Sequence, residues 1–154
     1  MNKPINKIMF VCHGNICRST MAEFLMKDLA NKHGKSDEYI IASSGTSSEE
    51  QGNPVHYGTR KILNSLGISC SGKYAEKLYS SDYDNYDLFI GMDERNVINM
   101  KRIFNGDPEN KVRLLLEYAG EKRNVADPYW TGDFDATYKD VKKGVDALFK
   151  FLSN

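Results

Sequence analysis

The feature that most constrains the fold is an alternation of short apolar runs with longer stretches of helical spacing. Strands are predicted at residues 7–12, 39–43, 88–92 and 112–115. Helices are predicted at residues 20–33, 56–66 and 94–104, and from residue 134 to about residue 152. Because parallel strands need a crossover that is usually a helix, this alternation indicates an α/β protein with a parallel sheet. The 154 residues suffice for one core and no linker interrupts them, so we predict a single domain over residues 1–154.

The first apolar run, Ile8–Val11, leads into a short polar loop that opens the first helix. A strand, a tight loop and a helix in this order direct backbone N–H groups and a helix dipole at an anion. Cys12 lies at the end of the strand and Arg18 at the start of the helix, so both can face the same bound group. Gly14 and Asn15 tolerate left-handed backbone angles, which a loop that folds its N–H groups inward requires. We therefore predict a phosphate-binding loop between the first strand and the first helix.

The residue types in this loop indicate nucleophilic chemistry. A free thiol has a pKa of about 8.5 and is a poor nucleophile at neutral pH, but inward N–H donors and Arg18 favour the thiolate of Cys12. The planar guanidinium of Arg18 matches two phosphoryl oxygens, and the hydroxyl of Ser19 can donate a hydrogen bond to the thiolate. A buried structural thiol is the alternative for Cys12, yet such a thiol needs neither a Gly-Asn loop nor a neighbouring arginine.

The sequence also predicts how two of the helices begin. Ser19 or Thr20 is suited to the N-cap of the first helix, and Glu23 can complete a capping box there. Asp93 is the predicted N-cap of the helix that follows the third strand.

The charge balance and the cysteine count argue against several classes of protein. The chain has 21 basic and 21 acidic residues and no long run of either sign, which argues against nucleic acid or a membrane surface as the main partner. Three cysteines, an odd number, do not form a disulfide framework, and we expect a cytoplasmic protein. Cys12, Cys17 and Cys70 lack the paired short spacing of a zinc site, so no metal is predicted.

The segment Cys12-His13-Gly14-Asn15-Ile16-Cys17-Arg18-Ser19 resembles the signature loop of the low-molecular-weight protein tyrosine phosphatases. The resemblance covers nearly the whole chain, through Gly52-Asn53-Pro54, Met92-Asp93 and Asp127-Pro128-Tyr129. It implies a three-layer α/β fold, in which a four-stranded parallel sheet carries helices on both faces. Ligands bind beyond the C-terminal ends of such strands, where Cys12 lies. His13 and Thr20 depart from the residues usual in the family, and we interpret both as changes at the rim of the loop.

The resemblance implies hydrolysis of phosphotyrosine, or of other aryl phosphate monoesters, through a cysteinyl-phosphate intermediate and without a cofactor. Cys12 is then the nucleophile and Arg18 binds the phosphate. The other loop residues expected to contact the phosphate or shape its site are His13, Gly14, Asn15, Ile16, Cys17 and Ser19. The expected partners are phosphotyrosine-containing proteins or small aryl phosphates, with oxyanions such as phosphate or vanadate as inhibitors. The protein is expected to act as a monomer.

A second catalytic group is expected, because a phenolate with a conjugate-acid pKa of about 10 leaves reluctantly at neutral pH. Asp127 is the candidate for this proton donor. Pro128 restricts Asp127 to extended angles, and burial near a phosphate dianion would keep its carboxyl protonated. Asp-Pro alone is a common turn signal. The resemblance makes Asp127 the general acid, and afterwards the base that activates water against the cysteinyl-phosphate.

The resemblance assigns Tyr129 and Trp130 to a wall of the pocket that grips the aromatic ring of the substrate. A deep aromatic slot favours phosphotyrosine, whose phosphate stands farther from the backbone than that of phosphoserine. Glu49 aligns with a position that is aromatic in many relatives, and like-charge repulsion there would disfavour acidic peptides. Tyr129 is itself phosphorylated in some relatives, and the sequence leaves open whether this happens here.

Three further positions are interpreted from the resemblance. Ser43 matches a serine that hydrogen-bonds Asn15 and holds its strained backbone. Gly72 stands where a histidine usually joins this network, so either the loop is less rigid or another group substitutes. Cys17 is either a bystander or a redox partner, whose disulfide with Cys12 would protect the nucleophile from overoxidation.

Three other functions compete with phosphotyrosine hydrolysis. Thioredoxin-linked arsenate reductases need two further cysteines close together, and this chain has only Cys70 beyond the loop. Phosphoarginine phosphatases tend to carry Thr where Ile16 stands. A catalytically inactive phosphotyrosine-binding module would need neither the thiol of Cys12 nor the carboxyl of Asp127.

Overall fold

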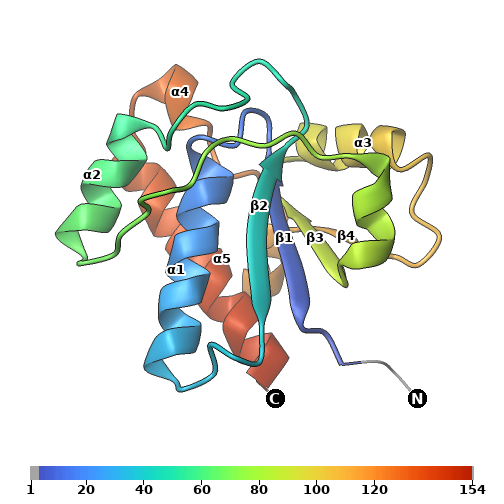
Figure 1. Ribbon diagram of the computed structural model, residues 1–154, viewed down its shortest axis with the longest axis horizontal. Helices are drawn as coiled ribbons and strands as arrows, with labels where there is room; N and C mark the ends of the chain where they lie inside the picture. Colours follow the sequence, from blue (N-terminus) through green and yellow to red (C-terminus); the bar gives the residue numbers. More distant parts are fainter. Residues whose placement is uncertain (1–3, 154) are drawn as a thin grey trace.

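Four parallel strands form the centre of the molecule in the computed structural model, which describes residues 4–153 (Figure 1). The strands are β1 (Lys7–Cys12), β2 (Ile40–Gly45), β3 (Leu88–Gly91) and β4 (Val112–Leu114). They lie in the order β2-β1-β3-β4, and every neighbouring pair is parallel. The carboxyl end of β1 therefore lies between two other strand ends, and Cys12 is its last residue.

Helices cover both faces of this sheet, which confirms the predicted three-layer α/β fold. The long helices are α1 (Arg18–Lys32), α2 (Tyr57–Ser65), α3 (Glu94–Ile103) and α5 (Phe134–Ser153). Figure 1 shows α1, α2 and α5 on one side of the sheet and α3 on the other. The strand, helix and sheet predictions were therefore correct to within a few residues at the element ends.

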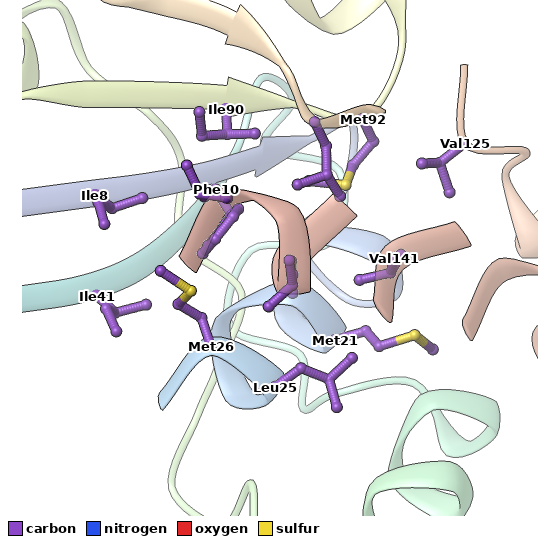
Figure 2. Packing of buried hydrophobic residues seen from close by; sticks show 14 of the residues in the cluster. Ile8, Phe10, Met21, Leu25, Met26, Ile41, Ile90, Met92, Val125 and Val141 are labelled. Atoms are coloured by element: carbon purple, nitrogen blue, oxygen red, sulfur yellow. The ribbon is translucent and has the colours of Figure 1, made fainter. Parts of the chain in front are cut away.

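The alternating side chains of β1 explain the two layers of core. Ile8 and Phe10 belong to the larger cluster, with residues of α1 and α5, and Figure 2 shows this packing around Met26. Met9 and Val11 face the opposite side and share a second cluster with residues such as Met100 of α3. Both faces of β1 are buried, so the strand is held on two sides and carries Cys12 at its end.

Three short elements were not predicted from the sequence. They are the 3₁₀ turns η1 (Ser80–Asn85) and η2 (Leu115–Ala119) and the single helical turn α4 (Pro128–Thr131). Each is too short to show a periodic apolar pattern. Within residues 4–153, no helix combines the length and the apolar character needed to cross a bilayer.

The predicted capping box of the first helix is wrong. The helix begins at Arg18, its N-cap is Cys17, and no side chain caps it. Thr20 donates to the carbonyl of Cys17 at 3.0 Å, and Glu23 points to other partners inside the protein. Thr20 is fully buried, so its interpretation as a residue of the rim is also wrong, whereas His13 is exposed there. Without a side-chain cap, the N–H groups of this helix end stay available to an anion.

Candidate active site

The loop between β1 and α1 curves around the sulfur of Cys12. The backbone N–H of Asn15 donates to this sulfur at 3.3 Å, and the hydroxyl oxygen of Ser19 lies 3.0 Å from it. Asn15 has a φ of 60°, the left-handed conformation that the sequence predicts for such a loop. The sulfur is buried, and these two polar groups are its neighbours inside the loop.

Gly45, the last residue of β2, lies against this loop and was missed by sequence reasoning. A Cβ atom at Gly45 would lie 2.7 Å from the carbonyl oxygen of His13 and 3.2 Å from the backbone nitrogen of Asn15. The next residue, Thr46, donates its N–H to the carbonyl of Cys12 at 2.9 Å. A glycine after a strand was the only signal in the sequence, and such glycines are common.

Replacing Gly45 with alanine is expected to displace the loop, because the contact is with backbone atoms that cannot rotate away. We expect the free energy of unfolding to fall by about 1–3 kcal/mol. We also expect kcat/KM for an aryl phosphate to fall at least about tenfold. The matched control is Gly67→Ala, which imposes a left-handed backbone on alanine but meets no atom within 4 Å. Thermal unfolding and phosphate release measure both effects. If Gly45→Ala lost stability but kept normal turnover, the prediction that the added Cβ atom displaces the loop would be wrong.

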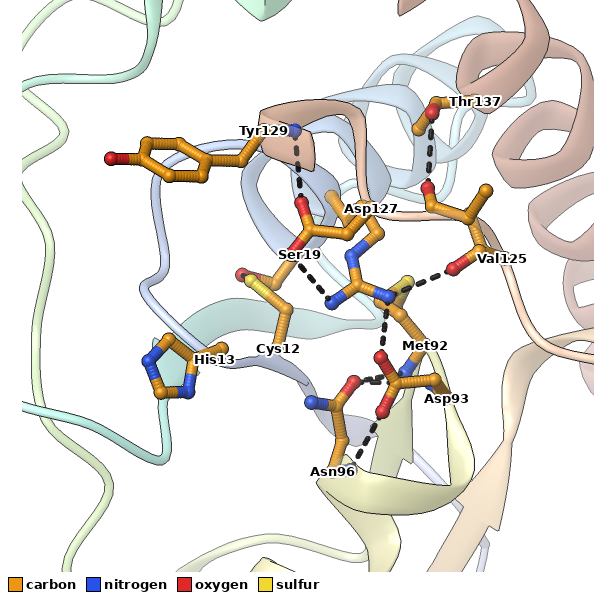
Figure 3. A network of polar contacts seen from close by, with 12 residues as sticks. Cys12, His13, Ser19, Met92, Asp93, Asn96, Val125, Asp127, Tyr129 and Thr137 are labelled. Carbon is orange, nitrogen blue, oxygen red and sulfur yellow. Dashed lines mark hydrogen bonds and ion pairs between the residues drawn. The ribbon is translucent and has the colours of Figure 1, made fainter. Parts of the chain in front are cut away.

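Arg18 is buried, and three acceptors from two distant segments hold its guanidinium. Its Nη1 donates to Asp93 at 2.7 Å and to the carbonyl of Val125 at 2.8 Å, and its Nη2 lies 3.5 Å from Asp127 (Figure 3). Burial by itself would lower the pKa of this guanidinium, but the negative groups of Cys12, Asp93 and Asp127 raise it overall. The arginine therefore stays charged beside the sulfur.

Asp93 has two functions here, of which the sequence predicted one. Its Oδ1 accepts the N–H of Asn96 at 2.8 Å, so Asp93 is the N-cap of α3 as expected. Its Oδ2 accepts from Arg18, which lies 75 residues earlier in the chain. No local pattern connects these two residues, so sequence reasoning missed the second function.

Asp127 caps the short helix α4 rather than lying in a plain loop. Its Oδ1 accepts the N–H of Tyr129 at 3.1 Å, and Pro128 occupies the first helical position, where its fixed φ is well suited. Its Oδ2 is directed toward Arg18. The carboxyl is three-quarters buried and is held next to the loop by the start of α4.

The pocket above Cys12 brings together most of the predicted site residues. The loop contributes Cys12, His13, Gly14, Ile16, Cys17 and Arg18 to its lining, while Asn15 and Ser19 are buried outside it. Asp127, the N-cap of α4, and Tyr129 and Trp130 of α4 complete the predicted part of the lining. Glu49, which the sequence places in a wall, lines it too, and so does Glu50, which was not predicted. The Tyr129 and Trp130 rings meet edge to face, with centroids 5.3 Å apart.

The supporting residues lie on the far side of the loop. Asn15 donates to the hydroxyl oxygen of Ser43 at 2.9 Å, which is the hydrogen bond expected from the sequence. Gly72 has open space around its Cα, and Glu23 and Lys73 lie against Ser43 instead. The network thus includes Glu23 and Lys73, which the sequence analysis did not assign to it.

Cys17 differs from Cys12 in its surroundings. Burial raises the pKa of the Cys17 thiol, and the nearby Cys12 and Asp127 groups raise it further. Cys17 is therefore protonated at neutral pH. All three cysteines are free thiols in this structure, and a disulfide between Cys12 and Cys17 stays a prediction. Among residues 4–153, no group of three or more His, Cys, Asp or Glu side chains is arranged to hold a metal ion.

Comparison with known proteins decides the family. A family model described as low molecular weight phosphotyrosine protein phosphatase matches residues 7–154. The chain belongs to this family. It is therefore a cysteine-dependent phosphatase of the low-molecular-weight class.

Relatives of this phosphatase align along almost its full length. The low molecular weight protein-tyrosine-phosphatase YfkJ of Bacillus subtilis is 36% identical over 143 residues, which is 92% of each chain. The crystal structure of YfkJ matches with a TM-score of 0.92 and 35% identity, covering 99% of this chain and 98% of that one. The phosphatase PtpA of Staphylococcus epidermidis is 38% identical over 146 residues, 94% of this chain and 92% of that one. A Drosophila arginine phosphatase matches with a TM-score of 0.87 at 25% identity, covering 96% and 98% of the two chains.

Proposed function

We propose that this phosphatase hydrolyses phosphotyrosine through a phosphocysteine formed on Cys12, with Arg18 and Asp127 as its partners. The observation that carries the proposal is the meeting of three groups in one pocket. They are a sulfur that receives an N–H donor, a charged guanidinium, and a carboxyl held 3.5 Å from that guanidinium. Phosphoryl transfer to sulfur requires these three functions, since the nucleophile, the phosphate charge and the leaving oxygen each need a partner.

In the first step, the phosphate lies over Cys12, with its oxygens on the N–H groups of the loop and on Arg18. The thiolate forms a bond to phosphorus while the bond from phosphorus to the tyrosyl oxygen breaks. Asp127 gives its proton to that oxygen, so tyrosine leaves as a neutral phenol. Asp93 and Val125 already hold the guanidinium of Arg18 in place, so it loses little orientational freedom when the phosphate binds.

In the second step, water attacks the phosphorus of the phosphocysteine. The carboxylate of Asp127 takes a proton from this water, and the sulfur–phosphorus bond breaks to release phosphate and the thiolate. The hydroxyl of Ser19, 3.0 Å from the sulfur, can donate to the departing anion. The proton balance of Asp127 is restored, and no metal enters either step. Phosphate and vanadate are expected to inhibit by occupying the same loop.

The aromatic residues of the rim support a phosphotyrosine substrate. Tyr129 and Trp130 are exposed beside the pocket, where an aryl ring attached to the phosphate would pass between them and the loop. Ile16 is buried and apolar and belongs to the pocket lining. A phosphoarginine substrate is the second candidate, since one structural relative is an arginine phosphatase at 25% identity. We further propose that the protein acts in the cytoplasm as a monomer.

One assay separates these substrates. Phosphate release is measured from a phosphotyrosyl peptide and a phosphoarginyl peptide of matched sequence, and arsenate reduction is measured with thioredoxin. We expect turnover of the phosphotyrosyl peptide to be the fastest and no reduction of arsenate. Faster hydrolysis of phosphoarginine would overturn the assignment of the substrate while leaving the chemistry of Cys12 intact.

The acidic rim predicts a preference among phosphotyrosyl peptides. Glu49 is 74% exposed and pairs with His13 at 3.3 Å, so its charge faces any peptide that enters the pocket. Glu49→Lys is expected to raise kcat/KM for a peptide with acidic flanks about fivefold, and to lower it for a peptide with basic flanks. The matched control is Glu38→Lys, an exposed residue just before β2, at the opposite end of the sheet. Equal effects of both substitutions, or an effect that persists in high salt, would contradict this prediction.

A further inference from the structure

The segment that carries Asp127 is short and has little core of its own. Helix α4 has four residues, of which only Pro128 is buried, so the position of Asp127 depends on the contacts at either end of the segment. Before Asp127, the carbonyl of Val125 accepts from Arg18 at 2.8 Å. After α4, Gly132 adopts a left-handed conformation with a φ of 73° and leads into α5. The start of α5 therefore supports the far end of this segment.

The first turn of α5 contacts two different parts of the proposed active site. Thr137 is buried, and its hydroxyl donates to the carbonyl of Ala126, directly before Asp127, at 3.1 Å. Phe134 lies one turn earlier and packs against a small buried cluster that includes Ile16 of the loop between β1 and α1. One helical turn thus connects the segment of the proposed acid with the loop of the proposed nucleophile.

The ring of Phe134 is held by the beginning of α2. The imidazole of His56 stacks on it, with the ring centroids 5.0 Å apart and the planes inclined by 20°. A Cβ atom at Gly58 would lie 2.6 Å from three atoms of the same ring, so the ring lies directly against the backbone of α2. His56 is also the N-cap of α2, because its Nδ1 accepts the N–H of Gly58 at 3.1 Å. This hydrogen bond orients the imidazole for the stack.

The same turn of α2 is fixed to the loop between β1 and α1. The backbone N–H of His56 donates to the carbonyl of Ile16 at 2.8 Å. Thr59 is fully buried, and its hydroxyl donates to the carbonyl of Cys17 at 3.1 Å. The beginning of α2 therefore holds the loop by hydrogen bonds and holds Phe134 by an aromatic stack.

We propose that His56 and Phe134 are positioning residues, whose stacked rings hold the segment of Asp127 at a fixed distance from the loop that carries Cys12. A general acid must lie within hydrogen-bond reach of the oxygen that it protonates, and a displacement of about 1 Å can slow a reaction about a hundredfold. Two stacked rings at van der Waals contact set such a distance, since closer approach is excluded and separation loses the contact. The proposal rests on the proposed function, because it requires Asp127 to act as the acid.

The variant His56→Asn tests the stack, because asparagine also caps a helix but has no ring. The measured quantity is kcat/KM, which covers the steps up to departure of the phenol. With phenyl phosphate, we expect kcat/KM to fall about tenfold, since the leaving phenolate needs the proton of Asp127. With dinitrophenyl phosphate, whose phenolate leaves without a proton, the loss should be less than about threefold.

Two companion variants and a matched control isolate the stacked rings. His56→Phe keeps a ring on Phe134 but loses the cap, so it should lower the melting temperature and retain most of the rate with phenyl phosphate. Gly58→Ala keeps both rings but pushes Phe134 away, so it should resemble His56→Asn. The control is His33→Asn, which removes an imidazole from Phe149 near the other end of α5 and should change neither rate.

Two further measurements distinguish an effect on Asp127 from an effect on the loop. The rate of Cys12 alkylation by iodoacetamide should stay within about twofold of the native rate in His56→Asn, because the surroundings of the sulfur are unchanged. In an Asp127→Asn background, His56→Asn should cause no further loss with phenyl phosphate, since no proton donor is left to position. Thermal unfolding checks that each variant is folded.

Four results would overturn the proposal. They are a native rate with phenyl phosphate in His56→Asn, equal losses with both substrates, alkylation that slows in parallel with turnover, and full additivity with Asp127→Asn. A failure of the proposed function has a different signature, because Asp127→Asn by itself would then be as active as the native enzyme. A slow Asp127→Asn beside a native rate in His56→Asn would reject the positioning residues alone.

Discussion

Serine in place of Cys12 is expected to abolish phosphotyrosine turnover, with a loss of at least about 10⁴-fold. A hydroxyl is a far weaker acid and a weaker nucleophile than a thiol, so the oxygen of the new serine cannot replace sulfur in the attack on phosphorus. Serine is smaller than cysteine, so it fits the buried position at the end of β1 without overlap. The loop and Arg18 should therefore still bind the phosphate.

Two measurements check this result. Phosphate release reports the loss of turnover, and calorimetric titration with a phosphotyrosyl peptide should show that binding is retained. Mass spectrometry of the acid-quenched native enzyme should find the phosphoryl group on the Cys12 peptide. Cys70→Ser is the matched control, because Cys70 is also buried but lies outside the pocket lining. A Cys12→Ser enzyme that kept its rate, or native turnover stopped by chelators, would refute the mechanism.

Alanine in place of Asp127 is expected to slow phosphotyrosine hydrolysis by about 10²–10⁴-fold. The loss should shrink for aryl phosphates whose phenols are more acidic, since their phenolates leave without a proton. The rate should therefore depend more steeply on the acidity of the leaving group than in the native enzyme. Steady-state kinetics with a series of substituted phenyl phosphates measures this dependence.

A structural effect of the same substitution must be separated from the chemical one. Asp127 caps α4, and loss of a cap costs about 1 kcal/mol. Asparagine keeps the capping oxygen but cannot transfer the proton, so Asp127→Asn is expected to keep α4 in place and still lose turnover. If Asp127→Asn were as active as the native enzyme, or if Asp127→Ala slowed all substrates equally, Asp127 would only hold α4.

The accuracy of the fold prediction has a physical cause. The strands β1 and β3 are buried on both faces and read as continuous apolar runs, while α5 repeats its apolar residues at helical spacing over 20 residues. The errors in the predicted secondary structure occur in short segments whose conformation depends on tertiary contacts. Helix α1 starts at the loop around Cys12 without a side-chain cap, and Glu23 is used inside the protein instead.

The sequence alone determined the loop around Cys12, because the strand, the loop and the helix that build it are contiguous. Cys12, Asn15, Arg18 and Ser19 lie within eight residues, and local geometry brings them around one centre. Asp127 could be named only through the resemblance, since its place beside Arg18 arises from a contact across 109 residues. Here the parallel sheet is decisive, because it gathers strand ends that are far apart in the chain.

The tertiary structure alone decided which residues hold this loop in place. Asp93 reaches Arg18 because β3 lies next to β1, and Gly45 approaches the loop because β2 lies on the other side. Glu23 meets Lys73 because α1 packs on the sheet near the end of β2. No local pattern marks these contacts, since each depends on the order of the strands and on the face that each helix covers. The immediate surroundings of Cys12 are thus a local property of the chain, and the support of its loop is a property of the whole fold.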